Sequence, residues 1–87
     1  MKAVITVIGK DTVGIIANVS NLLYKHDINI LDISQTIMQD LFTMIMLVDM
    51  RGSSVGDISA EIKQIEEKMN LSIHIQHEDI FNSMHRI

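Results

Sequence analysis

The sequence predicts an α+β fold, a βαββαβ sandwich in which two helices cover one face of a four-stranded antiparallel sheet. Three observations predict it. Four segments carry the β-branched or alternating pattern of strands, two carry apolar residues at helical spacing, and their order is strand, helix, strand, strand, helix, strand. Right-handed crossovers then give the spatial strand order four, one, three, two.

The first strand is predicted over Lys2 to Ile8, where β-branched residues dominate and the run ends at a glycine. Both of its faces are apolar, which places it inside the sheet. A helix is predicted from Thr12 to about Lys25, with Asp11 as its N-cap. Its buried stripe is predicted to contain Ile16, Val19, Leu22 and Leu23.

A hairpin is predicted next, with strands over Ile28 to Met38 and Leu41 to Met50 and a two-residue turn, Gln39-Asp40. Its first strand is an edge of the sheet, and unpaired edge groups invite a partner chain. The predicted register puts one row of pairs on the buried side: Ile37 with Phe42, Ile33 with Met46, and Leu31 with Val48. Met44 and Met46 therefore fall among core positions.

The second helix begins with Ser54 followed by Asp57, the spacing of a capping box. Its apolar stripe is Val55, Ile58, Ile62, Ile65 and Met69, and its length favours a packing helix over a coiled coil. Leu71 to His77 alternates as the last strand, and Glu78 to Ile87 is predicted as a short C-terminal helix. The whole is the split βαβ, or ferredoxin-like, arrangement.

The length of 87 residues predicts a single domain over residues 1–87. A domain this short buries only about 60–65% of the surface that its unfolded chain exposes, so its stability is marginal. It has no cysteine for a disulfide, and its four scattered histidines show no metal-ligand spacing. Association is the remaining stabiliser, and we expect a homodimer or a higher oligomer.

The charge pattern narrows the partners. Seven basic residues are dispersed among eleven acidic ones, for a formal net charge of -4. Binding to nucleic acid or to an anionic membrane requires clustered basic residues, so neither is expected. The apolar run Ala3 to Ile8 is too short for a signal peptide core or a membrane span. A cytoplasmic location is expected.

The turn from the first strand to the first helix, Gly9 to Gly14, is the first candidate site. The N–H groups of Val13, Gly14 and Ile15 are expected in the first helical turn, without intrahelical partners. With Asp11 beside them, they match a zwitterion, whose carboxylate meets the amides and whose ammonium meets Asp11. From the residues alone, the commoner explanation is structural: Asp11 caps the helix and Gly14 packs against the sheet.

Asn29 is the second candidate, because an amide at the start of the second strand can both donate and accept hydrogen bonds. The alternative is a turn asparagine that bonds its own backbone. Gln35 falls on the inward face by parity, but the sequence assigns it no role. His74 and His77 point to opposite faces of a strand and cannot share a metal.

Catalytic patterns are missing from the sequence. It has no cysteine nucleophile, no serine with a His–Asp pair at a recognisable spacing, and no glycine-rich phosphate loop. RNA-binding sheets of this topology need exposed aromatic residues, whereas Phe42 is predicted to be buried. We therefore expect neither an enzyme nor a bound cofactor or metal.

In order along the chain, the segment GKDTVGII from Gly9, then Ile28-Asn29-Ile30, then Asp32 to Gln35 resemble the ACT domain. ACT domains are small βαββαβ regulatory modules that commonly bind amino acids between paired copies. The chain most resembles small stand-alone ACT proteins of unassigned function, including their tail from Asp79 to Met84. It also resembles the ACT portions of the glycine-cleavage-system repressor and of formyltetrahydrofolate deformylase.

The resemblance implies roles for three residues. Asp11 matches the polar ligand position of the first loop, Gly14 matches the glycine that lets a ligand or partner approach, and Asn29 matches the strand-two asparagine that contacts bound amino acid across the interface. Two positions depart from the family pattern. Val13 replaces a common proline, and Gly9 replaces the histidine of serine sensors, which puts serine specificity in doubt.

The resulting hypothesis is a regulatory domain that senses an amino acid at a homodimer interface and modulates a partner protein. The alternative is a ligand-free dimerisation or adaptor module, in which the same loop and edge strand contact only protein.

Overall fold

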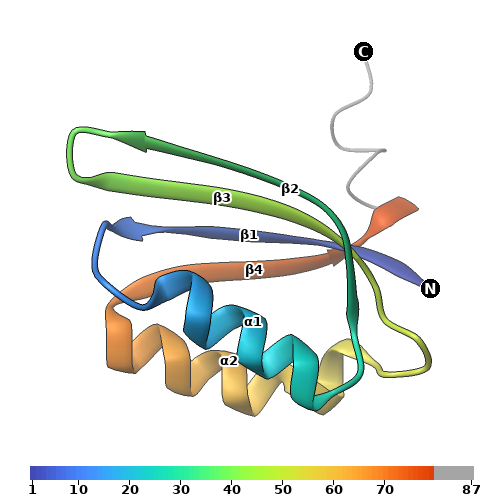
Figure 1. Cartoon of the computed structure of the whole chain (residues 1–87). Helices are drawn as coiled ribbons and strands as arrows, with labels where there is room; N and C mark the ends of the chain where they lie inside the picture. Colours follow the sequence, from blue (N-terminus) through green and yellow to red (C-terminus); the bar gives the residue numbers. More distant parts are fainter. Residues whose placement is uncertain (80–87) are drawn as a thin grey trace.

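The computed structural model describes residues 1–79, and its elements follow the predicted order (Figure 1). They are β1 (Lys2–Lys10), α1 (Ile15–Lys25), β2 (Asn29–Met38), β3 (Leu41–Asp49), α2 (Val55–Met69) and β4 (Leu71–His77). All pairings are antiparallel and the sheet order is β2-β3-β1-β4, so the predicted topology is confirmed. The predicted C-terminal helix lies outside the described residues, apart from the helical Glu78 and Asp79.

The core lies between the sheet and the two helices, which cover the same face (Figure 1). β1 is central, as predicted, because it pairs with both β3 and β4. Its inward residues Ala3, Ile5 and Val7 are buried together with inward residues of β3 and of both helices. Met44 and Met46 are each 1% exposed, which confirms that they fill the core.

The first helix begins later than predicted, at Ile15 instead of Thr12. Gly14 precedes it with a φ of 96°, in the left-handed region, so the backbone before Ile15 cannot continue the helix. The late start also changes the buried stripe. Ile15 is buried, whereas Ile16, which was predicted to be buried, is 42% exposed.

The hairpin has the predicted register near its turn and loses it near its open end. Ile37 pairs with Phe42 and Ile33 pairs with Met46, as predicted. The predicted pair of Leu31 with Val48 is wrong, because a bulge between Ile30 and Asp32 places Ile30 opposite Val48. One extra residue in a strand reverses the face of every residue beyond it.

The predicted buried face of β2 is also wrong. Every residue of β2 is exposed, including the inward Ile33 at 44% and Ile37 at 49%. Figure 1 shows why: β2 is the outermost strand of the sheet and lies farthest from the two helices. The inward residues Phe42 and Met44 of the neighbouring β3 remain buried. Both faces and one edge of this strand are therefore uncovered.

The second helix confirms the predicted capping box. The Ser54 side chain accepts a hydrogen bond from the N–H of Asp57, and the Asp57 carboxylate accepts one from the N–H of Ser54. Of the predicted stripe, Ile58 and Ile62 are buried and the other members are half-buried. The helix ends at Asn70, whose left-handed backbone turns the chain into β4.

Candidate functional site

The loop between β1 and α1 meets the turn of the β2–β3 hairpin. The backbone N–H of Asp11 donates to the carbonyl oxygen of Asp40 at 2.7 Å, which fixes the two loops against each other. Asp11 and Thr12 are exposed, and the side chain of Val13 is 100% exposed. The predicted turn is thus a surface loop held in place by its backbone, with its side chains facing solvent.

Asp11 does not cap α1, contrary to prediction, because Gly14 is the N-cap and no side chain accepts a hydrogen bond from the N–H groups of the first turn. The carbonyl of Gly14 accepts from the Asn18 backbone N–H at 2.9 Å and from its side-chain Nδ2 at 2.7 Å. The first-turn N–H groups are those of Ile15, Ile16 and Ala17, so the predicted set was two residues early. The helix start remains open to an acceptor from outside the helix.

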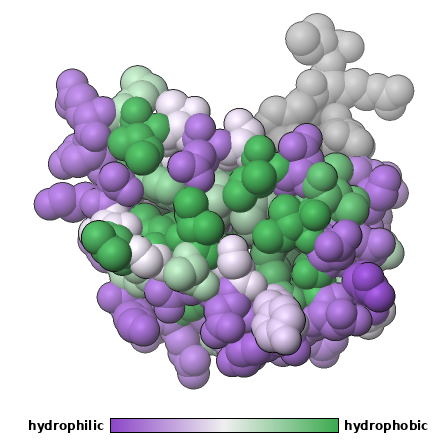
Figure 2. Space-filling view, in the orientation of Figure 1, coloured by the Kyte–Doolittle hydropathy of each residue, from purple (hydrophilic) through white to green (hydrophobic). Residues whose placement is uncertain are grey.

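A cavity of about 400 Å³ lies at this helix start. It brings together four of the five predicted site residues, Asp11, Val13, Gly14 and Ile15, with residues from the neighbouring hairpin. The lining residues are Asp11, Thr12, Val13, Gly14, Ile15, Ile16, Ala17, Gln35, Ile37 and Phe42. Figure 2 shows hydrophobic surface in the hollow between strands and helices, with polar surface around it.

Gln35 is the site residue that the sequence left without a role. Its parity placed it on the inward face, and the exposure of β2 turns that position into a cavity wall instead of a core position. The signal that could have found it was already present: a polar residue between the apolar Ile33 and Ile37 on the same face. Its amide adds both a donor and an acceptor to the cavity.

The chemistry of the cavity suits a small zwitterion. Asp11 is an anion for an ammonium group, the open helix start presents N–H groups and a positive dipole end for a carboxylate, and Ile37 with Phe42 supplies an apolar wall. An isolated phosphate fits less well, because the Asp11 carboxylate would repel it.

Gly9 has a packing reason to lack a side chain. A Cβ there would lie 2.6 Å from Cδ2 of Leu71 and 3.1 Å from the carbonyl oxygen of Asn70. The start of β4 therefore occupies the space that a larger residue would need. A histidine at this position would require the Leu71 side chain to move aside and the backbone at Asn70 and Leu71 to shift slightly.

Asn29 lies far from the cavity of its own chain. It pairs with Asp49 at one end of β2, whereas Met38 at the other end pairs with Leu41, which in turn pairs with Lys10 at the start of the loop. Ile37 lies eight positions along the strand from Asn29, a span of about 26 Å at 3.3 Å per residue. One chain does not bring the fifth predicted residue to the other four.

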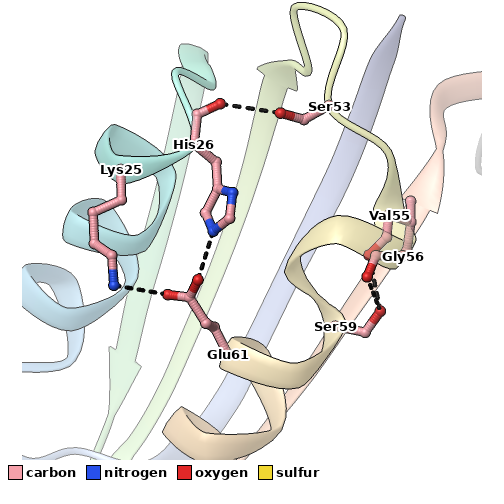
Figure 3. Close-up of polar contacts among 7 residues, drawn as sticks. All are labelled: Lys25, His26, Ser53, Val55, Gly56, Ser59 and Glu61. Carbon is pink, nitrogen blue, oxygen red and sulfur yellow. Dashed lines mark hydrogen bonds and ion pairs between the residues drawn. The ribbon is translucent and has the colours of Figure 1, made fainter.

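A second polar cluster joins the two helices away from this cavity (Figure 3). His26 Nε2 lies 2.6 Å from Oε1 of Glu61, Lys25 Nζ lies 3.0 Å from its Oε2, and the Ser53 hydroxyl donates to the His26 carbonyl at 3.1 Å. Hydrogen bonds from His26 and then Lys25 lower the pKa of the Glu61 carboxyl. Sequence analysis missed this partner of His26, because Glu61 is 35 residues away in the chain.

This cluster is best explained as a structural link. Lys25 and Glu61 also line a smaller cavity of about 200 Å³ between the helices, but their charged groups are already paired with each other. Among residues 1–79, no three His, Cys, Asp or Glu side chains are placed to hold a metal ion. No helix in this part of the chain is long and apolar enough to cross a membrane.

Comparison with known proteins agrees with the resemblance found in the sequence. A family model described as the ACT domain matches residues 2–76. A UPF0237 protein of Clostridium acetobutylicum is 58% identical, and the match covers 100% of both chains. The solved structure of an ACT domain protein from Streptococcus pneumoniae has a TM-score of 0.80 and 39% identity, with 93% of each chain covered.

Two further solved structures share the fold. A formyltetrahydrofolate deformylase from Pseudomonas putida KT2440 matches with a TM-score of 0.81 and 9% identity, over 88% of this chain and 29% of its own. A protein assigned as a glycine cleavage system transcriptional repressor matches with a TM-score of 0.75 and 24% identity, over 88% of this chain and 47% of its own. These two likenesses concern the fold alone.

Proposed function

The chain belongs to the ACT domain family, and on that premise we propose that it is a cytoplasmic regulatory domain that binds a small amino acid at a homodimer interface. ACT domains are generally small-ligand-binding regulatory domains. The observation that supports the proposal is the cavity of about 400 Å³. Asp11, the open helix start and Gln35 supply its polar groups, and Ile37 and Phe42 supply its apolar wall.

The exposed β2 strand supports a homodimer. It is an edge strand of ten residues, all exposed, and the helices do not cover its inward-facing Ile33 and Ile37. A bare apolar edge is a template for pairing with another chain. An antiparallel pairing of β2 with β2 of a second copy is self-complementary, as a twofold interface requires.

Such a pairing would complete the site. If the twofold axis passes near Ile33, residue 29 of one copy lies within about one position of residue 37 of the other, because residue numbers across a regular antiparallel pair have a constant sum and the bulge at Leu31 shifts that sum by one. Asn29 of the second copy would then lie beside Ile37, which lines the cavity. The distance of Asn29 from the cavity of its own chain is what a shared site predicts.

The proposed role is regulatory and not catalytic. Ligand binding at a shared interface would stabilise the dimer and so change the surface offered to a partner protein. The bare β2 edge also supports a ligand-free dimerisation or adaptor module as the second candidate, because pairing along that edge does not need an occupied cavity.

A thermal-shift screen against the twenty amino acids tests the proposal. A ligand at a hundred times its dissociation constant stabilises the folded state by about 2.7 kcal/mol, which is readily measured. We expect a small amino acid to raise the melting temperature, and both Asp11→Ala and Asn29→Ala to weaken its binding. Asn21→Ala is the matched control, because Asn21 is exposed on α1 and lies outside this cavity.

The oligomeric state separates the outcomes. Light scattering should give a dimer, and Gln35→Pro, which removes one outward-facing N–H of the edge strand, should weaken it. A dimer that no amino acid stabilises would favour the adaptor module. A monomer at high micromolar concentration would remove the interface on which both candidates depend.

A further inference from the structure

The sheet has a second edge, β4, and a side chain from a helix closes it. The Glu66 carboxylate, on α2, accepts a hydrogen bond from the backbone N–H of Ile73 at 2.9 Å. Ile73 pairs with Val7 of β1 across the strand, so an N–H that bonds Glu66 is one that faces away from β1. Glu66 is half-buried and holds this edge donor from a separate element.

Glu66 also lines a largely apolar groove along the same edge. A cavity of about 390 Å³ lies between α2 and β4 and is lined by Ser59, Ala60, Ile62, Lys63, Glu66, Ile73 and Ile75. A strand added to β4 would bring side chains to this groove, but its carbonyl would first have to displace the Glu66 carboxylate from Ile73. An acidic side chain at a strand edge is a known way to prevent such addition.

The β2 edge differs in how its donor is held. Asp32 Oδ1 accepts from the N–H of Ile33 at 2.8 Å, but both groups are exposed and adjacent in one strand. Rotation of the Asp32 side chain frees that N–H without moving any other element. The β2 edge can therefore open locally, whereas opening the β4 edge requires Glu66 to leave its place between α2 and β4.

The relative direction of β2 and β4 explains why a closed β4 edge matters for assembly. Three successive antiparallel pairings separate β2 from β4, so these two edge strands run in opposite directions. A second copy related by simple translation could therefore add its β4 to β2 as a regular antiparallel pair. Head-to-tail addition of this kind does not close and builds an open-ended assembly.

We propose that Glu66 closes the β4 edge against strand addition and thereby confines self-association to the β2 edge of a second copy of this chain. This inference rests on one part of the proposed function, namely that two copies pair through β2. Pairing through β2 alone ends at a dimer, whereas two open edges on each chain would let the sheet grow without limit.

The test replaces Glu66 and follows both assembly and edge protection. Glu66→Ala should form species larger than the wild-type protein, increasing with concentration in sedimentation velocity. By hydrogen exchange, the Ile73 amide should exchange about tenfold faster, as the loss of a charge-assisted bond predicts. The amides of Ser72 and His74, which face β1, should keep their protection and so report that the variant is folded.

Two variants provide controls. Glu66→Gln keeps an oxygen acceptor for Ile73 and should keep the wild-type mass, and Glu67→Ala removes the neighbouring charge from an exposed position and should do the same. Adding Gln35→Pro to Glu66→Ala should reduce the large species if growth joins β4 to β2. An unchanged mass for a folded Glu66→Ala with a fast Ile73 amide would overturn the inference, as would equal growth of Glu66→Gln. The wild-type mass tests the β2 dimer separately.

Discussion

The two helices of this domain begin in opposite ways. At α2, Ser54 and Asp57 exchange hydrogen bonds between side chain and backbone, so the helix supplies its own acceptors. At α1, Gly14 is the N-cap, its φ is 96°, and no side chain accepts from the first turn. The start of α2 is closed by its own side chains, whereas the open start of α1 faces a cavity and has no side-chain acceptor for its N–H groups.

The difference lies in one position of the local sequence. A Ser, Thr, Asp or Asn at an N-cap stabilises a helix by about 1 kcal/mol, and this chain uses such a residue at α2 but not at α1. Asp11 has the right side chain but stands three residues before the N-cap, where its backbone bonds to Asp40 instead. Its carboxylate is thereby left beside the cavity.

The largest effect is expected from Gly14→Ala. A residue with a Cβ in the left-handed region costs about 1–2 kcal/mol of stability, and here the added Cβ would also lie 3.4 Å from Asn18 Nδ2. We expect this loss in chemical denaturation, together with weaker amino-acid binding, because Gly14 lines the cavity and a shift of its strained backbone would move the open helix start.

Gly52→Ala is the matched control for that prediction. Gly52 has nearly the same φ, 94°, and nothing lies within 4 Å of the added Cβ. It should lose similar stability while amino-acid affinity is unchanged. Equal effects of the two variants on affinity would show that the start of α1 has no special role in binding.

Ser54→Ala should have the next largest effect. It removes one half of the capping box and should cost about 1 kcal/mol, or about 4–8 °C in melting temperature for a domain of this size. Because α2 starts away from the cavity, amino-acid affinity measured by calorimetry should not change. A loss of affinity equal to that of Gly14→Ala would erase the contrast between the two helix starts.

The features that the sequence predicted correctly depend on contacts between residues close together in the chain, and those that it missed depend on contacts between distant residues. The capping box of α2 is local, with Ser54 and Asp57 three residues apart, and it was predicted correctly. The start of α1 was not, because Gly14 could equally sit inside a helix or stop it, and the hydrogen bond from Asp11 to Asp40 that holds the loop joins residues far apart in the chain. Tertiary contacts therefore determine that α1 begins after Gly14.

The β2 strand shows a second limit. Alternation placed Ile33 and Ile37 correctly on the inward face, but alternation does not say how far the helix layer extends. The bulge at Leu31 also contains no glycine, which would have indicated it in the sequence. Gln35 was therefore left without a role. The exposure of β2, which made the burial prediction wrong, is also what makes Gln35 part of the cavity wall.

The third prediction concerns the loss of stability at acid pH, which should depend on the cap of α2 and not on the start of α1. The backbone N–H of Ser54, and then its hydroxyl, lower the pKa of the Asp57 carboxyl below its ordinary value of 3.8. A lowered folded-state pKa gives stability that is complete above the unfolded value and is lost as the pH falls through the folded one. Stability from the α2 cap should therefore decline only below about pH 4.

Asp57→Asn should flatten that decline, and acid titration of the free energy of unfolding measures it. Glu61, whose pKa is lowered by His26 and Lys25, also contributes in this range, so the comparison is between variants and not with a flat baseline. At α1 no side chain accepts a hydrogen bond from the first turn, so that helix start has no cap carboxylate that corresponds to Asp57. A profile for Asp57→Asn that matches the wild type would remove the acid role of the capping box.

The smallest effect on stability is expected from Asp11→Ala. Its side chain makes no cap bond, and the hydrogen bond to Asp40 comes from its backbone, which alanine retains. The free energy of unfolding should therefore change by less than about 0.5 kcal/mol, as for ordinary surface substitutions. A loss near that of Ser54→Ala would mean that Asp11 stabilises the helix start after all. A small change in stability beside a clear loss of amino-acid affinity would place the role of Asp11 in the ligand, which is the distinction that the two helix starts predict.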